Sequence, residues 1–185
     1  MKRAMKRFDP KVLRGYAATA VILLAVLTWP SDGWSKTSRH GCDVNPFVVR
    51  LLNNWAAKLA ASTPEKPGSI VGTYAPDKPG PLAVLLPTCA NGPSIGHAAI
   101  EEYFVEHFLA NKPVVVGGFV DPTIGGDCNV AFASGLYTFQ LNGGTPKERL
   151  LRARYTYIFR RGLITQHHSS LEPDTPANTC KPPQE

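Results

Sequence analysis

The segment that most constrains the fold runs from residue 114 to 171, where apolar and polar residues alternate in four successive stretches. These stretches are 114–120, 130–141, 150–160 and 163–171. Successive side chains of a strand point to opposite faces of a sheet, so the alternation predicts four strands. Only short connections separate them, namely DPTIGGD, NGGTPKE and Arg161-Gly162. Short connections of this kind favour an antiparallel meander.

Two amphipathic helices are expected before these strands. In 43–61 the apolar residues recur at steps of three and four, and Asp43 or Asn45 can serve as the N-cap. A second helix is expected over 94–109, and a short apolar strand over 82–87 precedes it. Helices followed by a four-stranded meander predict an α+β domain, in which the helices pack on one face of a curved, mainly antiparallel sheet.

The first 35 residues have the features of a secretory signal peptide. Six lysines and arginines precede the apolar run AATAVILLAVL, which is shorter than the roughly 20 residues that a membrane-spanning helix needs. No clean A-x-A cleavage site follows the run, so an uncleaved N-terminal membrane anchor is the alternative. We therefore expect 1–35 to be a signal peptide or an anchor, and 36–185 to form one domain that is periplasmic or secreted.

The net charge of +6 does not indicate a nucleic-acid-binding protein. Residues 1–35 carry six basic and two acidic side chains, which leaves a net charge of +2 for residues 36–185. No stripe of basic and aromatic residues remains that could bind phosphates. We expect no nucleic-acid partner, and contact with a membrane only through the N-terminal segment if it stays uncleaved.

All four cysteines lie in the part of the chain that is expected to be exported. They are Cys42, Cys89, Cys128 and Cys180. None belongs to a C-x-x-C motif, so neither a zinc site nor a thioredoxin-type redox site is indicated. An even number of cysteines in an oxidising compartment predicts two disulfides.

Six segments occur in an order that resembles a known superfamily. They are NNWAAKLA, TYAPDKPGPLAVLLPT, GHAAIEEYFVEHFL, SGLYTFQL, ARYTYIFR and HHSSLEP. The chain resembles SnoaL-like proteins and, within them, bacterial domains similar to the calcium/calmodulin-dependent protein kinase II association domain. The resemblance implies a cone-like α+β barrel of the cystatin-like, nuclear transport factor 2 type, with a pocket between helices and sheet and a homodimer formed through the sheet. It does not imply a kinase, because the kinase sequence motifs are absent.

The resemblance also implies how the cysteines pair. In that fold the strand at 82–88 lies beside the final strand and runs in the same direction, so Cys89 should lie near the segment that leads to Cys180. Cys128 should come within reach of Cys42 at the start of the first helix. The expected disulfides are therefore Cys89–Cys180 and Cys42–Cys128.

Two adjacent histidines, His167 and His168, lie on the last expected strand. They point to opposite faces, so they cannot bind one metal ion together, and no metal site is expected. The serines that follow them are not part of a G-x-S-x-G motif, which argues against a Ser-His pair. Neither face of the strand is plainly apolar. The resemblance aligns His168 with a histidine of the association domain and so makes His168 the pocket candidate, with a hydrogen-bonded structural role as the alternative.

One arginine and three tyrosines complete the set of pocket candidates. Arg154 lies on the polar face of its strand, where it is either solvated or, if this face lines the cone, available to bind a carboxylate. The arginine of the association domain aligns nearer Thr156, which weakens the second reading. Tyr103, Tyr137 and Tyr74 are apolar enough for the core, although their hydroxyl groups need partners when buried.

Two functions of different classes fit these features. The first is an exported, non-catalytic domain for self-association or for binding a small-molecule ligand. The alternative is a small acid-base lyase or isomerase that uses His168, Arg154 and a tyrosine. No aspartate or glutamate can be singled out as its proton-abstracting base, which lowers the support for an enzyme. No cofactor is expected, and the expected protein partner is a second copy of the chain.

Overall fold

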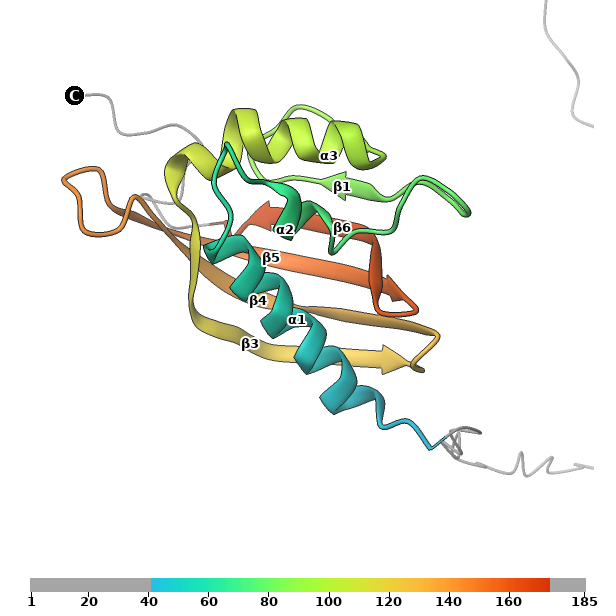
Figure 1. The fold of residues 1–185 in the computed structure, drawn as a ribbon. Coiled ribbons are helices and arrows are strands. Elements are labelled where there is room, and N and C mark those ends of the chain that lie inside the picture. Colours follow the sequence, from blue (N-terminus) through green and yellow to red (C-terminus); the bar gives the residue numbers. More distant parts are fainter. Residues whose placement is uncertain (1–40, 174–185) are drawn as a thin grey trace, which may run out of the picture. The chain divides into compact units, whose positions relative to one another are not determined.

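The computed structural model describes residues 41–173, so the expected signal segment and Cys180 lie outside the described residues. Six strands form one sheet in the order β2-β1-β6-β5-β4-β3. All neighbouring strands are antiparallel except β1 and β6. The helices cover one face of the sheet, with α1 crossing it in front of β4 and β3 (Figure 1). This is the predicted α+β cone.

The predicted meander is confirmed. Its strands are β3 (Val114–Gly126), β4 (Val130–Leu141), β5 (Arg149–Arg160) and β6 (Leu163–Leu171). Strand β3 continues through most of the segment DPTIGGD, which was expected to be a connection. Two register shifts against β4, after Val116 and after Val120, accommodate the extra residues. Such bulges and a proline are tolerated there because β3 is an edge strand.

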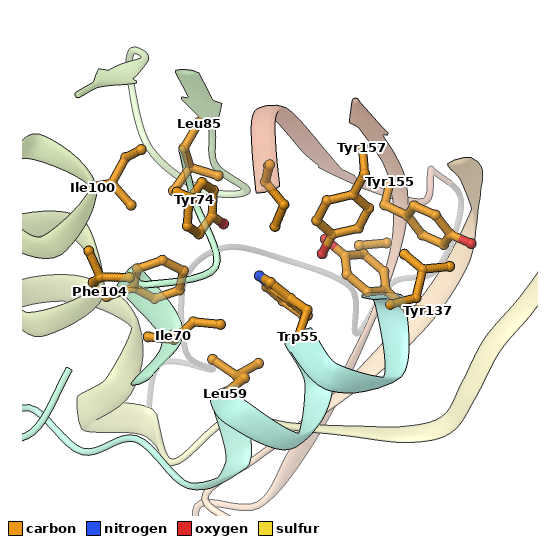
Figure 2. Close-up of a cluster of buried hydrophobic side chains, with 14 of the residues drawn as sticks. Trp55, Leu59, Ile70, Tyr74, Leu85, Ile100, Phe104, Tyr137, Tyr155 and Tyr157 are labelled. Atoms are coloured by element: carbon orange, nitrogen blue, oxygen red, sulfur yellow. The ribbon is translucent and has the colours of Figure 1, made fainter. Parts of the chain in front are cut away.

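The first helix, α1 (Val44–Ala60), also matches its prediction. The side chain of Asp43 caps it by accepting a hydrogen bond from the backbone N–H of Asn45 at 3.2 Å. The buried side of α1 carries Val48, Leu52, Trp55 and Leu59. Figure 2 shows Trp55 and Leu59 reaching from α1 into the cluster of aromatic side chains between the helices and the sheet.

The second expected helix is present from His97 onward, but its turns change type along its length and it extends to Asn111. Its region comprises β2 (Ser94–Ile95), α3 (His97–Tyr103), a π-helical turn (Phe104–Phe108) and a 3-10 turn (Leu109–Asn111). A four-residue helix, α2 (Gly68–Val71), lies in the Pro/Gly-rich stretch before it, where no element was expected. Both α2 and β2 are too short to produce a periodic pattern, since one helical turn already takes 3.6 residues.

Strand β1 (Val84–Leu86) pairs in parallel with β6, as the resemblance implied. Leu86 lies opposite His168 in this pair. Both strands therefore run toward the same end of the sheet.

One of the two predicted disulfides, Cys42–Cys128, is present, with a Cα–Cα distance of 6.3 Å. It connects the start of α1 to the turn between β3 and β4. Cys89 is also disulfide-bonded, whereas its expected partner Cys180 lies outside the described residues. Within 41–173 no helix is long and apolar enough to cross a membrane, and no group of three potential metal ligands occurs.

Candidate binding site

The histidine that faces the interior of the cone is His167, which corrects the assignment of His168. His167 is 3% exposed, whereas His168 is exposed on the opposite face of the sheet. The tyrosine ring of Tyr157 stacks on His167 with a centroid distance of 4.1 Å, and Trp55 meets the imidazole edge-on at 5.4 Å. The two histidines do point to opposite faces, as predicted, but His167 rather than His168 points into the cone.

A β-bulge at Thr165 places His167, and not His168, on the same face as Ile164. Ile164, His167 and Ser169 are all buried, which strict alternation along β6 would forbid. Phe159 of β5 lies opposite Ile164 and Ile158 lies opposite Gln166, so Thr165 has no partner on β5. Its hydroxyl group donates a hydrogen bond to the carbonyl of Ile158 at 3.2 Å. One extra residue reverses the faces of every residue beyond it.

The bulge lies where β6 changes its neighbour. The backbone of Ile164 bonds to the segment 73–75, donating to the carbonyl of Thr73 at 2.9 Å and accepting from the N–H of Ala75 at 2.8 Å. From Gln166 onward β6 pairs with β1 instead. The segment 73–75 also carries Tyr74, whose side chain enters the cone beside His167.

Arg154 lies on the outer face of the sheet, not in the cone. Its guanidinium group is exposed and donates a hydrogen bond to the carbonyl of Leu171 at 3.2 Å. Thr156, the next outward residue of β5, is opposite His168. The predicted alternation of β5 is correct, so Arg154 has the solvated role that was the first of its two readings.

The interior polar groups form a chain of hydrogen bonds. The Tyr74 hydroxyl lies 2.8 Å from Nδ1 of His167, and the Tyr137 hydroxyl lies 3.4 Å from Nε2. Tyr137 donates to the hydroxyl of Ser169 at 2.6 Å, and Ser169 in turn contacts the hydroxyl of Thr88. Because the single proton of Tyr137 goes to Ser169, Nε2 of His167 must be the donor to Tyr137 and Nδ1 the acceptor from Tyr74.

Burial keeps the residues of this hydrogen-bond chain neutral. It lowers the pKa of His167 to about 3, and the nearby charge of His168 adds to the effect. Burial also raises the pKa of Tyr74, Tyr103 and Tyr137 well above the ordinary value, although the hydrogen bond to Ser169 opposes the rise for Tyr137. The imidazole and the phenols are therefore uncharged at neutral pH, so the interior offers hydrogen bonds rather than charge.

A cavity of about 380 Å³ opens beside these hydrogen-bonded residues. Its walls are mainly apolar and come from the end of α3, the π-helical turn, β4 and β5. They include Tyr103, Phe108, Phe139, Leu141, Leu151 and Ala153. At the outer end the lining carries polar side chains from four different segments, Asn91, His107, Asn111 and Arg149. The cavity thus has an apolar body and a polar mouth.

A smaller space of about 20 Å³ continues the cavity inward. Tyr103 and Thr88 line both spaces, and Trp55, Tyr137 and His167 line only the inner one. This inner pouch has room for about one water molecule. The indole N–H of Trp55 is buried, and its interaction with the Tyr74 hydroxyl partly opposes the burial-driven rise of the Tyr74 pKa.

Of the predicted pocket residues, the structure brings Tyr74, Tyr103 and Tyr137 to the cone and places His168 and Arg154 outside it. Sequence reasoning missed Trp55, Ser169 and Thr88. Trp55 had a usable signal, because a tryptophan on the apolar side of a predicted helix must point into whatever the helix covers. Thr88 had none, since it lies in a loop beyond a three-residue strand.

Comparison with known proteins agrees with this architecture. No family model matches the sequence, and no curated protein matches it either. A solved structure from Xanthomonas campestris, named for the calcium/calmodulin-dependent protein kinase II association domain, is 34% identical with a TM-score of 0.59. The match covers 69% of this chain and 87% of that chain.

More distant structures share the fold alone. A Streptomyces avermitilis protein, named as a dehydratase of the NTF2-like family, is 13% identical with a TM-score of 0.56, and the match covers 70% of this chain and 96% of that one. A Nostoc punctiforme protein with a cystatin-like fold is 14% identical with a TM-score of 0.51, covering 71% and 92%.

Proposed function

The chain belongs to the nuclear transport factor 2-like superfamily, among the bacterial proteins that resemble the kinase II association domain, and we propose that it is an exported, non-catalytic member that self-associates and binds a small ligand in its cone. The observation that carries the proposal is the neutrality of the interior. None of the described residues that line the cavity or the pouch is an aspartate or a glutamate. The buried imidazole of His167 is engaged at both nitrogens and is too weak a base, with a pKa of about 3, for proton abstraction near neutral pH.

The shape and chemistry of the cavity define the ligand class. Its volume falls within the range of about 300 to 1,000 Å³ that is usual for small-molecule sites. Aromatic walls from Tyr103, Phe108 and Phe139 suit a flat, largely apolar body. At the inner end the pouch has room for about one water molecule, which would connect an acceptor atom of the ligand to the polar groups of the pouch.

Self-association is supported by the outer face of the sheet. No described helix covers this face (Figure 1), and it exposes large apolar side chains. Phe132 is 42% exposed and lies opposite Ile158, Leu150 is 54% exposed, and Leu136 lies between these two levels of the sheet, opposite Arg154. A second copy of the chain would bury such a face with the same residues on both sides.

Export is supported by the N-terminal pattern and by cysteine usage. The described domain contains a disulfide between segments 86 residues apart, and disulfides persist mainly in oxidising compartments. N-terminal sequencing of protein recovered from the periplasm tests this part of the proposal. A first residue near position 36 is expected, and a chain that keeps residues 1–35 would contradict cleavage.

Ligand binding can be tested with a variant that narrows the mouth. Ala90 lines the mouth and is exposed, so Ala90→Trp should block entry without disturbing the core. Ala57→Trp, on an exposed position of α1 outside the cavity lining, is the matched control. Native mass spectrometry of the purified protein with a metabolite library should detect a bound molecule whose affinity falls at least tenfold in Ala90→Trp only. Turnover of that molecule by the wild-type protein would refute the non-catalytic assignment.

The oligomeric part of the proposal has a separate test. Light scattering at micromolar concentration should give the mass of a dimer for residues 36–185. Phe132→Lys should convert it to a monomer, because it buries a charge in the interface. Val49→Lys, at a position of α1 with a similar exposure of 39%, should remain a dimer. A wild-type monomer would contradict self-association without affecting the ligand proposal.

A further inference from the structure

The hydrogen bonds inside the cone all run in one direction. The indole N–H of Trp55 can only donate, and it interacts with the Tyr74 hydroxyl, towards which the indole nitrogen lies (Figure 2). Tyr74 donates to Nδ1 of His167, and Nε2 of His167 donates to the Tyr137 hydroxyl. Tyr137 donates in turn to Ser169. Each side chain of this hydrogen-bond chain therefore accepts from the one before it or donates to the one after it, from α1 to β6.

The last bond, between Ser169 and Thr88, has to run in the same direction. Within 41–173 the side-chain hydrogen bonds of these two hydroxyls are the one between them and the one that Ser169 accepts from Tyr137. Ser169 is only 7% exposed, so its proton would be buried without an acceptor if Thr88 were the donor. Thr88 is half-buried and lines the cavity. Ser169 therefore donates to Thr88, and the Thr88 proton is left for the cavity.

The position of Thr88 gives this proton a role in ligand binding. Thr88 lines both the outer cavity and the inner pouch. We propose that the Thr88 hydroxyl is the donor that orients the ligand, and that the cone takes flat, largely apolar molecules with a neutral acceptor, such as a ketone carbonyl, at their inner end. The inference rests on the proposed function, because it assigns a chemical class to the ligand of the same cavity.

The direction of the hydrogen-bond chain disfavours a ligand whose inner group can only donate. Such a group would face the Thr88 proton, and turning that proton towards Ser169 would leave the buried Ser169 proton without an acceptor. A water molecule in the pouch would not change this preference. After it accepts from Thr88, its own protons remain to be donated to the ligand.

A charged acceptor is disfavoured at the same place. None of the described residues that line the pouch is a lysine or an arginine, so a carboxylate there would lose its hydration without gaining a cation. Arg149 lines only the outer cavity, at its mouth. A carbonyl oxygen needs no cation. Thr88 is also a good donor for it, because a hydroxyl that accepts one hydrogen bond is polarised to donate another.

Two probes of nearly the same shape, 1-indanone and indane, test the donor role. They differ in one position, where a carbonyl replaces a CH₂ group. NMR titration of residues 36–185 measures the affinity of each, and the ratio of the two affinities cancels effects of a variant on folding or on the apolar walls. In Thr88→Val the ratio of indanone to indane affinity should fall by about fivefold or more, the value of one hydrogen bond.

Three further variants show which hydroxyl is responsible. Thr88→Ser keeps the hydroxyl and should keep the ratio. Thr156→Val removes a threonine hydroxyl that does not line the cavity and is the matched control, so it should also keep the ratio. Tyr103 carries the other hydroxyl that lines both spaces. A ratio that falls in Tyr103→Phe but not in Thr88→Val would overturn the assignment to Thr88.

The remaining outcomes separate this inference from the proposed function. If both probes bind and Thr88→Val leaves the ratio unchanged, the donor role of Thr88 is wrong and the ligand site stands. If neither probe binds, the ligand site and the donor role both fail. The direction of the hydrogen-bond chain has a test without any ligand, because ¹⁵N NMR distinguishes the two neutral forms of His167. A proton on Nε2 is expected at pH 7.5, and a proton on Nδ1 would overturn the inference.

Discussion

Mild acid should destabilise the domain through His167, because the folded protein cannot protonate this side chain. Its pKa is about 3 in the cone, against an ordinary value of 6.5. Between these two pH values the unfolded chain binds a proton that the folded chain does not. The contribution of His167 to stability is therefore complete above pH 6.5 and is lost as the pH falls towards 3.

The size of the effect follows from the difference between the two pKa values. Each pKa unit corresponds to about 1.36 kcal/mol, so the full difference is on the order of 5 kcal/mol at pH 3. At pH 5, about 1.5 units below the unfolded value, the loss is about 2 kcal/mol. Domains of this size are stable by only about 5 to 15 kcal/mol, so this loss is readily measured.

Urea unfolding of residues 36–185 at pH 7.5 and pH 5 provides the assay. Trp55 is the only tryptophan in this part of the chain and lies against the imidazole, so its fluorescence reports directly on the cone. His167→Gln keeps a neutral donor and acceptor but cannot take up the proton. The free energy of unfolding should fall by about 2 kcal/mol more in the wild type than in the variant between the two pH values.

The comparison isolates one group, because every other titrating side chain is common to both proteins. Glu65 and Glu148, whose pKa values are lowered by hydrogen bonds, lose their contribution in acid equally in both. Equal pH dependence of the wild type and His167→Gln would refute the reasoning. It would mean that His167 is protonated in the folded state or reaches solvent.

Two further predictions use matched pairs of variants measured by urea unfolding at pH 7.5. Tyr137→Phe should lower the free energy of unfolding by about 1 to 3 kcal/mol, because it leaves buried hydrogen-bonding groups of its neighbours unsatisfied. Tyr155→Phe removes a buried hydroxyl that has no hydrogen-bond partner in the described domain, so it should be neutral or stabilising. Equal losses of stability in the two variants would contradict the hydrogen-bond chain. Gly135→Ala should lower the free energy of unfolding by about 1 to 3 kcal/mol, since its Cβ would lie 2.8 Å from the Tyr155 hydroxyl and 2.8 Å from the backbone oxygen of Val120. Gly68→Ala has open space around the new Cβ and should not change stability. A Gly135→Ala variant as stable as the wild type would show that β4 can move away from these neighbours.

The sequence was sufficient to predict the elements whose pattern is long. Strand β5 alternates without interruption over its 12 residues, and α1 keeps one apolar side over its 17 residues. Each pattern repeats often enough that only one period fits. The alternation of β5 also predicts the solvent-exposed position of Arg154, which was the first of the two roles considered for it. The Cys42–Cys128 pair required the resemblance in addition, because sequence separation alone does not bring the two cysteines together.

The site itself depended on a feature that has no pattern. Ile164 and His167 are separated by an odd number of positions, so any uniform alternation places them on opposite faces, and both are buried only because Thr165 bulges out of the ladder. A bulge adds a residue without changing composition, so neither hydropathy nor spacing marks its place. Its cause is non-local, since the segment 73–75 and then β1 take turns as neighbours of β6. The identity of the interior histidine is thus decided by strand pairing between distant segments. For that reason His167, rather than the better-aligned His168, is the residue whose variants should report on the cone.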